Sequence, residues 1–281
     1  MIDSFVTALQ TNSLLLSALI GGLASSLVSG IIGSYVVVKR IVFISGSIAH
    51  SVLSGIGLSL WLERAKGIEW ITPLQGALIA GVLSALLIGW IHLHYKQRED
   101  SVIAALWSIG MATGILFISQ TPGFNVELTN FLVGNILWVT PDDLSLLYWL
   151  DGVILVTVVC LHKRFLAICF DEEQARLQGL HVDALYLLLL VLISVSIVLL
   201  IQVVGIILVM TMLTIPPSIA NIFTARLSYM MGIAVAISCA LCISGMAIAY
   251  HFDWPGGATI ALTAGLLYIV SLCNSVWKFN K

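Results

Sequence analysis

The sequence predicts an all-α integral membrane protein, a polytopic helical bundle with about eight or nine transmembrane spans. Of its 281 residues, 60% are hydrophobic and 9% are charged, whereas soluble domains carry roughly 25% charged residues. The mean hydropathy is +1.09. The charged residues fall into a few clusters, and the uncharged runs between them reach the roughly 20 residues that a helix needs to cross a bilayer. We therefore expect residues 1–281 to form a single transmembrane domain.

The uncharged runs locate the individual spans, because a charged side chain is costly in the hydrocarbon core. One run, Ala184 to Ala225, is long enough for a helical hairpin, which we expect to turn near Gln202 to Gly205. The spans are expected between Asp3 and Lys39, Arg40 and Glu63, Glu69 and Lys96, and Asp100 and Glu127, then over Leu144 to His162, Ala184 to Ala225, Leu227 to Phe252 and Trp254 to Trp277.

Lysine and arginine predict the orientation, because short cytoplasmic loops retain positive charge. If the Lys39–Arg40 turn is cytoplasmic, ten of the 12 basic residues lie inside, and only Arg64 and Lys66 lie outside. The N-terminus is then external and the C-terminus cytoplasmic. The external segments are too small to form a domain, so capture of a substrate outside would need another protein.

The net charge and the absence of certain sequence motifs argue against several classes of function. The net charge of −2 offers no basic surface for nucleic acid. The chain has no G-x-x-x-x-G-K-[ST] phosphate loop, so it does not drive transport through a P-loop ATPase of its own. An intramembrane enzyme would need a catalytic motif such as H-E-x-x-H or G-x-S-x-G, and neither is present. A secondary metal-ion transporter remains an alternative, although no internal repeat is apparent.

Three ionisable residues are candidates for contact with a transported cation. His50 lies about ten residues into the second span, and neutral imidazole suits zinc and tolerates manganese. Asp151 lies about 12 Å inside the fifth span for a rise of 1.5 Å per residue. His251, two residues before Asp253, lies at the expected external mouth. The alternatives are a His50 hydrogen-bonded to a neighbouring helix, an Asp151 bound to a helix or water, and a His251 in a plain surface turn.

The chain resembles the permease family of bacterial zinc and manganese ABC importers, the ABC-3 family, over nearly its whole length. Four blocks in the family's order carry the resemblance, and His50 occupies the family's histidine position in the first. The blocks are GSYVVVKRIVFISGSIAHSVLSGIGL (Gly33 to Leu58), LTNFLVGNILWVTPDDL (Leu128 to Leu144), FDEEQARLQGL (Phe170 to Leu180) and DWPGG (Asp253 to Gly257).

The resemblance assigns a role to the polar segment 171–183, which by composition is either a short helix ended by Gly179 or an ordinary loop. Glu173, Ala175 and Gly179 match the spacing of the coupling segment that importer permeases insert into their ATPase. The sequence departs from the family at Gly46, where an aspartate commonly lies one helical turn before the histidine. Asp151 is a possible substitute for that carboxylate.

The resemblance further implies the assembly and the location of the protein. It implies a multi-pass permease of the bacterial inner (plasma) membrane, surrounded by membrane lipid and forming a homodimer. Its partners would be two copies of a cytoplasmic ABC ATPase and an external metal-binding protein. On this view the chain is not an enzyme and binds no cofactor, ATP is used by the partner subunit, and the cargo is zinc or manganese, with iron(II) also possible.

Overall fold

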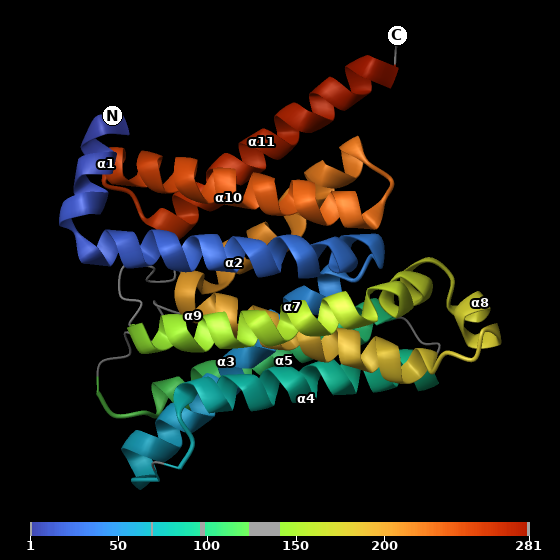
Figure 1. The fold of residues 1–281 in the computed structure, drawn as a ribbon. Helices are drawn as coiled ribbons and strands as arrows, with labels where there is room; N and C mark the ends of the chain where they lie inside the picture. The colour runs from blue at the N-terminus through green and yellow to red at the C-terminus, as the bar shows by residue number, and fades with distance from the viewer. Residues whose placement is uncertain (1, 69, 96–98, 124–140, 280–281) are drawn as a thin grey trace. The chain divides into compact units, whose positions relative to one another are not determined.

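The computed structural model describes residues 2–68, 70–95, 99–123 and 141–279, and every regular element in these ranges is a helix (Figure 1). The helices are α1 (Ile2–Thr11), α2 (Ser13–Val38), α3 (Val42–Lys66), α4 (Pro73–His94), α5 (Glu99–Ser119), α7 (Pro141–Phe170), α8 (Glu172–Leu177), α9 (Val182–Phe223), α10 (Leu227–Phe252) and α11 (Gly256–Phe279).

Nine helical segments in the described ranges are long and apolar enough to cross a membrane, which confirms the prediction of eight or nine spans. The predicted division of the Ala184 to Ala225 run falls at Gly205, where φ is 76° and ψ is 164°. Only glycine adopts this conformation without strain. Gly205 therefore separates the spans Val182–Ile201 and Gly205–Phe223 within α9.

The first uncharged run is longer than one span requires, and the structure divides it at Asn12. The Asn12 side-chain oxygen accepts a hydrogen bond from the backbone N–H of Leu15 at 3.4 Å. Asparagine in this position satisfies an amide that the first turn of a helix leaves unpaired. Asn12 thereby separates the ten-residue helix α1 from the membrane-spanning helix α2.

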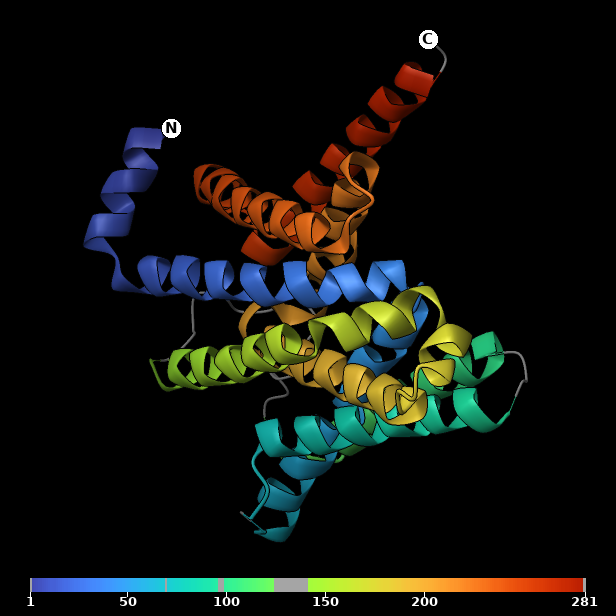
Figure 2. The same ribbon diagram turned by 45° about the vertical axis from the view of Figure 1, so that its right-hand side comes forward.

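The helices form two compact units, which we describe separately. The first unit comprises Met1–Val38, Leu132–Leu155 and Val203–Lys281, and the second comprises Lys39–Phe131 and Val156–Gln202. In the first unit α10 packs along α2 and also contacts α11 (Figure 2).

A glycine allows the close approach of α2 and α10 within the first unit. A methyl group on Gly30 would lie 2.7 Å from the backbone nitrogen of Val235. A side chain at position 30 would therefore force the two helices apart, and small residues play this role in membrane helix packing.

In the second unit, α3 packs against both α4 and α5. Gly110 and Gly114, spaced as G-x-x-x-G on α5, lie against α3: methyl groups there would approach Ser51 Cα and the Leu53 carbonyl carbon to 2.6 Å. Gly55 of α3 is equally close to the backbone of Gly76 on α4. These contacts hold α3 tightly between its neighbours and fix the placement of His50.

Candidate functional site

His50 lies on the face of α3 that packs against α5, and two serines fix the register of these helices. Ser47 Oγ donates a hydrogen bond to the Ile103 carbonyl at 2.9 Å, and Ser51 Oγ lies 3.3 Å from the Leu106 carbonyl. Side chains three and four positions apart share one face of a helix. The two serines therefore direct the half-buried His50 side chain toward α5.

Trp107 of α5 stacks on the His50 ring, with ring centroids 4.2 Å apart and planes inclined by 15°. His50 Nδ1 is buried and has no hydrogen-bond partner in the part of the chain that the structure describes. Stacking covers a face of the imidazole, whereas a metal ion binds a ring nitrogen in the plane of the ring. Trp107 therefore orients His50 without occupying Nδ1.

The described residues contain no group of three or more His, Cys, Asp or Glu side chains placed to hold a metal ion together. Gly46, one turn before His50, is buried and contributes no side-chain ligand. His50 thus has no second ligand on its own helix at this position. The role of His50 as a metal ligand stays a prediction.

Asp151 lies on α7 and is 8% exposed. No described residue pairs with its carboxylate through a hydrogen bond or an ion pair. A buried carboxylate is costly in a membrane helix and is a candidate for contact with a cation or a proton. Asp151 belongs to the first unit and His50 to the second, so their joint action stays a prediction.

His251 is exposed in the last turn of α10, and its ring lies 5.0 Å from that of Phe252. The helix ends at Asp253, whose backbone adopts the left-handed conformation with φ of 55°. The Trp254 N–H donates to the Ala249 carbonyl at 3.0 Å and closes this end. The helix end accounts for the local geometry, and a cation-guiding role for His251 stays a prediction.

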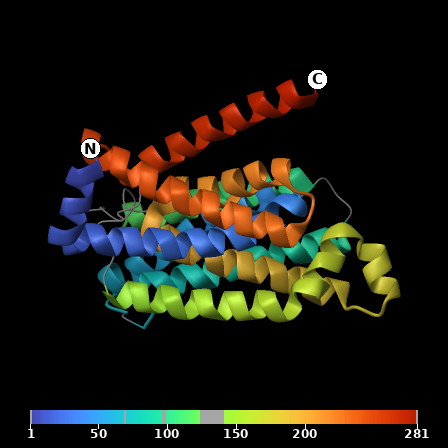
Figure 3. The same ribbon diagram turned by 45° about the horizontal axis from the view of Figure 1, so that its top comes forward.

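The polar segment 171–183 contains the short helix α8, so the expectation of a helix there is confirmed. Figure 3 shows α8 beyond the ends of α7 and α9, the two long helices that it connects. The Asp171 carboxylate accepts a hydrogen bond from the Gln174 N–H at 2.9 Å and begins the helix. Gly179, with φ of 81°, reverses the chain after it.

The predicted coupling residues divide between the two faces of α8. Ala175 is 1% exposed and packs inward, whereas Glu173 lies on the exposed face. Leu177, one turn after Glu173, is 88% exposed. Glu173 and Leu177 therefore form the exposed face of α8, and Ala175 the buried one.

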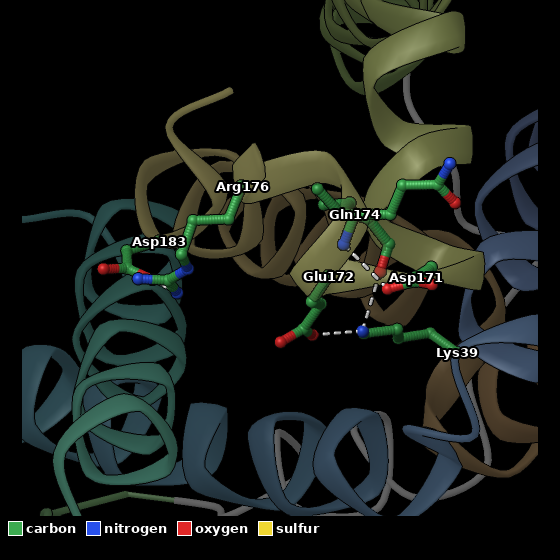
Figure 4. Close-up of polar contacts among 7 residues, drawn as sticks. Lys39, Asp171, Glu172, Gln174, Arg176 and Asp183 are labelled. Carbon is green, nitrogen blue, oxygen red and sulfur yellow. Dashed lines mark hydrogen bonds and ion pairs between the residues drawn. The ribbon is translucent and has the colours of Figure 1, made fainter. Parts of the chain in front are cut away.

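Lys39, in the turn between α2 and α3, connects α8 to the helices around it. Its Nζ donates a hydrogen bond to the Ile168 carbonyl at 2.8 Å and forms an ion pair with Glu172 (Figure 4). Nζ also lies 5.8 Å from the ring centroid of the buried Tyr186 on α9, within cation–π range. The Lys39 side chain is only 14% exposed.

Sequence reasoning did not identify Trp107 or the Lys39–Glu172 pair. Trp107 does share a helical stripe with Gly110 and Gly114, and this periodicity places it on the closely packed face of α5. Lys39 and Glu172 are 133 residues apart, and no local pattern links them. Most of the predicted block Leu128 to Leu144 lies outside the described residues.

Long apolar helices that carry isolated ionisable side chains define an integral membrane protein and are typical of membrane transport proteins. Residues 11–275 match the model of the ABC 3 transport family. The chain therefore belongs to the ABC 3 transport family and is a multi-pass protein of the bacterial inner membrane.

The relatives cover nearly the whole chain. A probable metal transport system membrane protein of Chlamydia pneumoniae is 49% identical over 92% of this chain and 88% of its own length. The manganese transport system membrane protein MntC of Halalkalibacterium halodurans is 30% identical over 95% of this chain and 89% of its own. The structure of PsaBC from Streptococcus pneumoniae in complex with Fab is similar with a TM-score of 0.85, at 28% identity, covering 96% of this chain and 95% of that one.

Proposed function

We propose that this chain is the permease subunit of an ATP-driven importer of a divalent metal ion: manganese, zinc or iron(II). The observation that carries the proposal is the half-buried His50, about two turns into α3, which stacks on Trp107 and whose Nδ1 has no hydrogen-bond partner among the described residues. Imidazole binds all three metals. The relatives named as metal and manganese transport proteins support the same cargo class.

A permease must bind the ion weakly enough to release it. Two protein ligands with water leave coordination positions open, in contrast to the closed four-ligand sites that hold structural zinc. In the proposed mechanism, the dimer alternates between external and cytoplasmic access, and the ion passes His50 with Asp151 as the second ligand. An external binding protein delivers the ion.

The energy for this cycle comes from two ABC ATPase subunits that dock on the cytoplasmic segment 171–183. Glu173 and Leu177 form the exposed face of α8 and supply one charged and one apolar contact. Ala175 holds the helix against the permease, and Gly179 sets the direction of the chain after it. Movement of the ATPase is thereby transmitted to α7 and α9.

The cargo is tested by metal accumulation in a bacterial strain that lacks its own importer and expresses this chain with its ATPase and binding protein. We expect one of manganese, zinc or iron to accumulate well above the empty-vector level and to compete with the other two. A permease complex that accumulates none of the three metals contradicts the proposed cargo class. Accumulation that continues without the ATPase supports a secondary transporter.

The coupling role of α8 predicts that substitutions there release the ATPase. Glu173→Lys reverses the charge on the exposed face, and Gly179→Val strains a backbone with φ of 81°. We expect each variant to co-purify with several-fold less ATPase than the unaltered chain, since an interface charge reversal costs roughly 1–3 kcal/mol or more. Glu63→Lys, the same charge reversal at the exposed end of α3, serves as the matched control. Full retention of the ATPase by both α8 variants would count against the assignment.

A further inference from the structure

A pocket of about 440 Å³ opens in the second unit where the end of α7 meets the start of α9. Its lining includes two basic side chains, Arg164 and His181, and four leucines, Leu161, Leu180, Leu185 and Leu188. It contains neither His50 nor Trp107, and it differs from the proposed metal pathway in composition. The pocket is therefore a candidate binding site for a ligand other than the metal ion.

The polar part of the pocket favours an anion. No acidic residue lines it, and two of the carboxylates nearby in sequence are paired elsewhere, Glu172 with Lys39 and Asp183 with Arg176. The exposed Arg164 guanidinium has no ion-pair or hydrogen-bond partner among the described residues. Arginine presents a planar set of donors that binds phosphate oxygens in pairs.

The apolar part of the pocket extends into the membrane-spanning region. Leu188 lies about 9 Å along α9 from its start, and Leu161 about 13 Å along α7 from its end, at 1.5 Å per residue. Both leucines fall inside the spans Val182–Ile201 and Tyr148–Phe170, and each lies deeper along its helix than the basic residue near it, Leu188 two turns beyond His181 and Leu161 one turn before Arg164. A free phosphate ion can bind the basic side chains but has no apolar group to place against these leucines, whereas an acyl chain does.

We propose that this pocket binds an anionic phospholipid, with its phosphate at Arg164 and His181 and an acyl chain along the leucines. Basic pockets between transmembrane helices at the membrane interface bind anionic headgroups in this way. The inference is independent of the cargo. It places a lipid at the start of α9, directly after Gly179 and α8, where its presence stabilises the connection between α8 and the membrane.

Native mass spectrometry of the full-length protein in detergent tests the proposal, with phosphatidylglycerol and phosphatidylcholine of equal chain length as probes. We expect more bound phosphatidylglycerol than phosphatidylcholine, and about fivefold weaker phosphatidylglycerol binding in Arg164→Gln, because one basic residue contributes roughly 1 kcal/mol. Lys163→Gln removes the same charge from the adjacent exposed residue, which does not line the pocket, and should bind as the unaltered chain does. Equal losses in both variants, or none in either, overturn the proposal.

A phosphatidylglycerol with a photoreactive acyl chain supplies a test in the unaltered protein that does not depend on how Arg164→Gln folds. We expect cross-links to concentrate on the peptide containing Leu185 and Leu188, and millimolar glycerol 3-phosphate to leave them undiminished. Labelling spread evenly over the apolar helices contradicts a built site. Displacement by glycerol 3-phosphate shows a phosphate site without a lipid chain. If Arg164→Gln binds phosphatidylglycerol normally but no longer binds the ATPase, the pocket is a docking site for the ATPase and the lipid proposal is wrong.

Discussion

Replacement of His50 by alanine is expected to reduce metal accumulation to the level of cells without the permease. Its imidazole is the ionisable group that the structure places about two turns into α3, and Gly46 offers no alternative ligand one turn away. Loss of groups that merely support a metal ligand costs roughly 10- to 100-fold, so loss of the ligand itself should cost at least as much. The measurement is the cellular content of manganese, zinc and iron after growth in limiting metal.

His94→Ala is the matched control, because it removes the same side chain from the exposed end of α4. It should retain most of the accumulation, and the two variants should be extracted from the membrane in equal amounts and in the same oligomeric state as the unaltered chain. Normal metal accumulation by a well-expressed His50→Ala variant would show that His50 is not a ligand on the metal pathway.

Asp151→Asn decides whether Asp151 supplies the carboxylate that Gly46 lacks. We expect it to lower accumulation strongly, and we expect Asp151→Glu, which retains a carboxylate, to preserve a measurable part. Unchanged accumulation in Asp151→Asn, in cells where His50→Ala abolishes it, would exclude Asp151 as the second ligand. Asp151 would then be a buried polar residue of α7 with a structural role.

The stacking of Trp107 on His50 could not be predicted from the sequence. The stripe of Trp107, Gly110 and Gly114 identifies a closely packed face of one helix, but the partner helix of that face depends on the tertiary fold. The structure shows that the partner is α3 and that the indole covers the His50 ring. The sequence therefore does not predict which helix packs against this face of α5.

The membrane spans were more predictable, because the cost of charge in hydrocarbon acts on each segment locally. The uncharged runs located the nine spans, and the polar run with Gly179 located α8. The break at Asn12 was missed because an uncharged asparagine does not interrupt a run defined by charge. Hydrogen-bonding capacity, rather than charge, determines where α2 begins.

Loss of the Lys39 ammonium is expected to reduce transport while the ATPase remains bound. Lys39 contacts the end of α7 through the Ile168 carbonyl and the start of α8 through Glu172. It also lies three residues before the start of α3 at Val42, and His50 lies about two turns into that helix. Under the proposed mechanism, one partly buried side chain links α8 to the helix that carries His50. We expect Lys39→Gln to lower metal uptake by about fivefold or more, the range of a coupling free energy of roughly 1–3 kcal/mol.

The controls separate coupling from general damage. Arg40→Gln removes the same charge from the exposed neighbouring residue, which forms no hydrogen bond or ion pair with α8 among the described residues, and it should transport normally. Glu172→Gln keeps an oxygen that accepts from Lys39 and leaves the Ile168 contact intact, so its loss of uptake should be smaller than that of Lys39→Gln. Metal uptake and ATP hydrolysis are measured on the same reconstituted complexes. We expect the Lys39→Gln complex to continue to hydrolyse ATP while it takes up little metal, because ATP hydrolysis would then no longer be coupled to movement of α3. If Lys39→Gln and Arg40→Gln transport equally well, the force from α8 must reach α3 by another route.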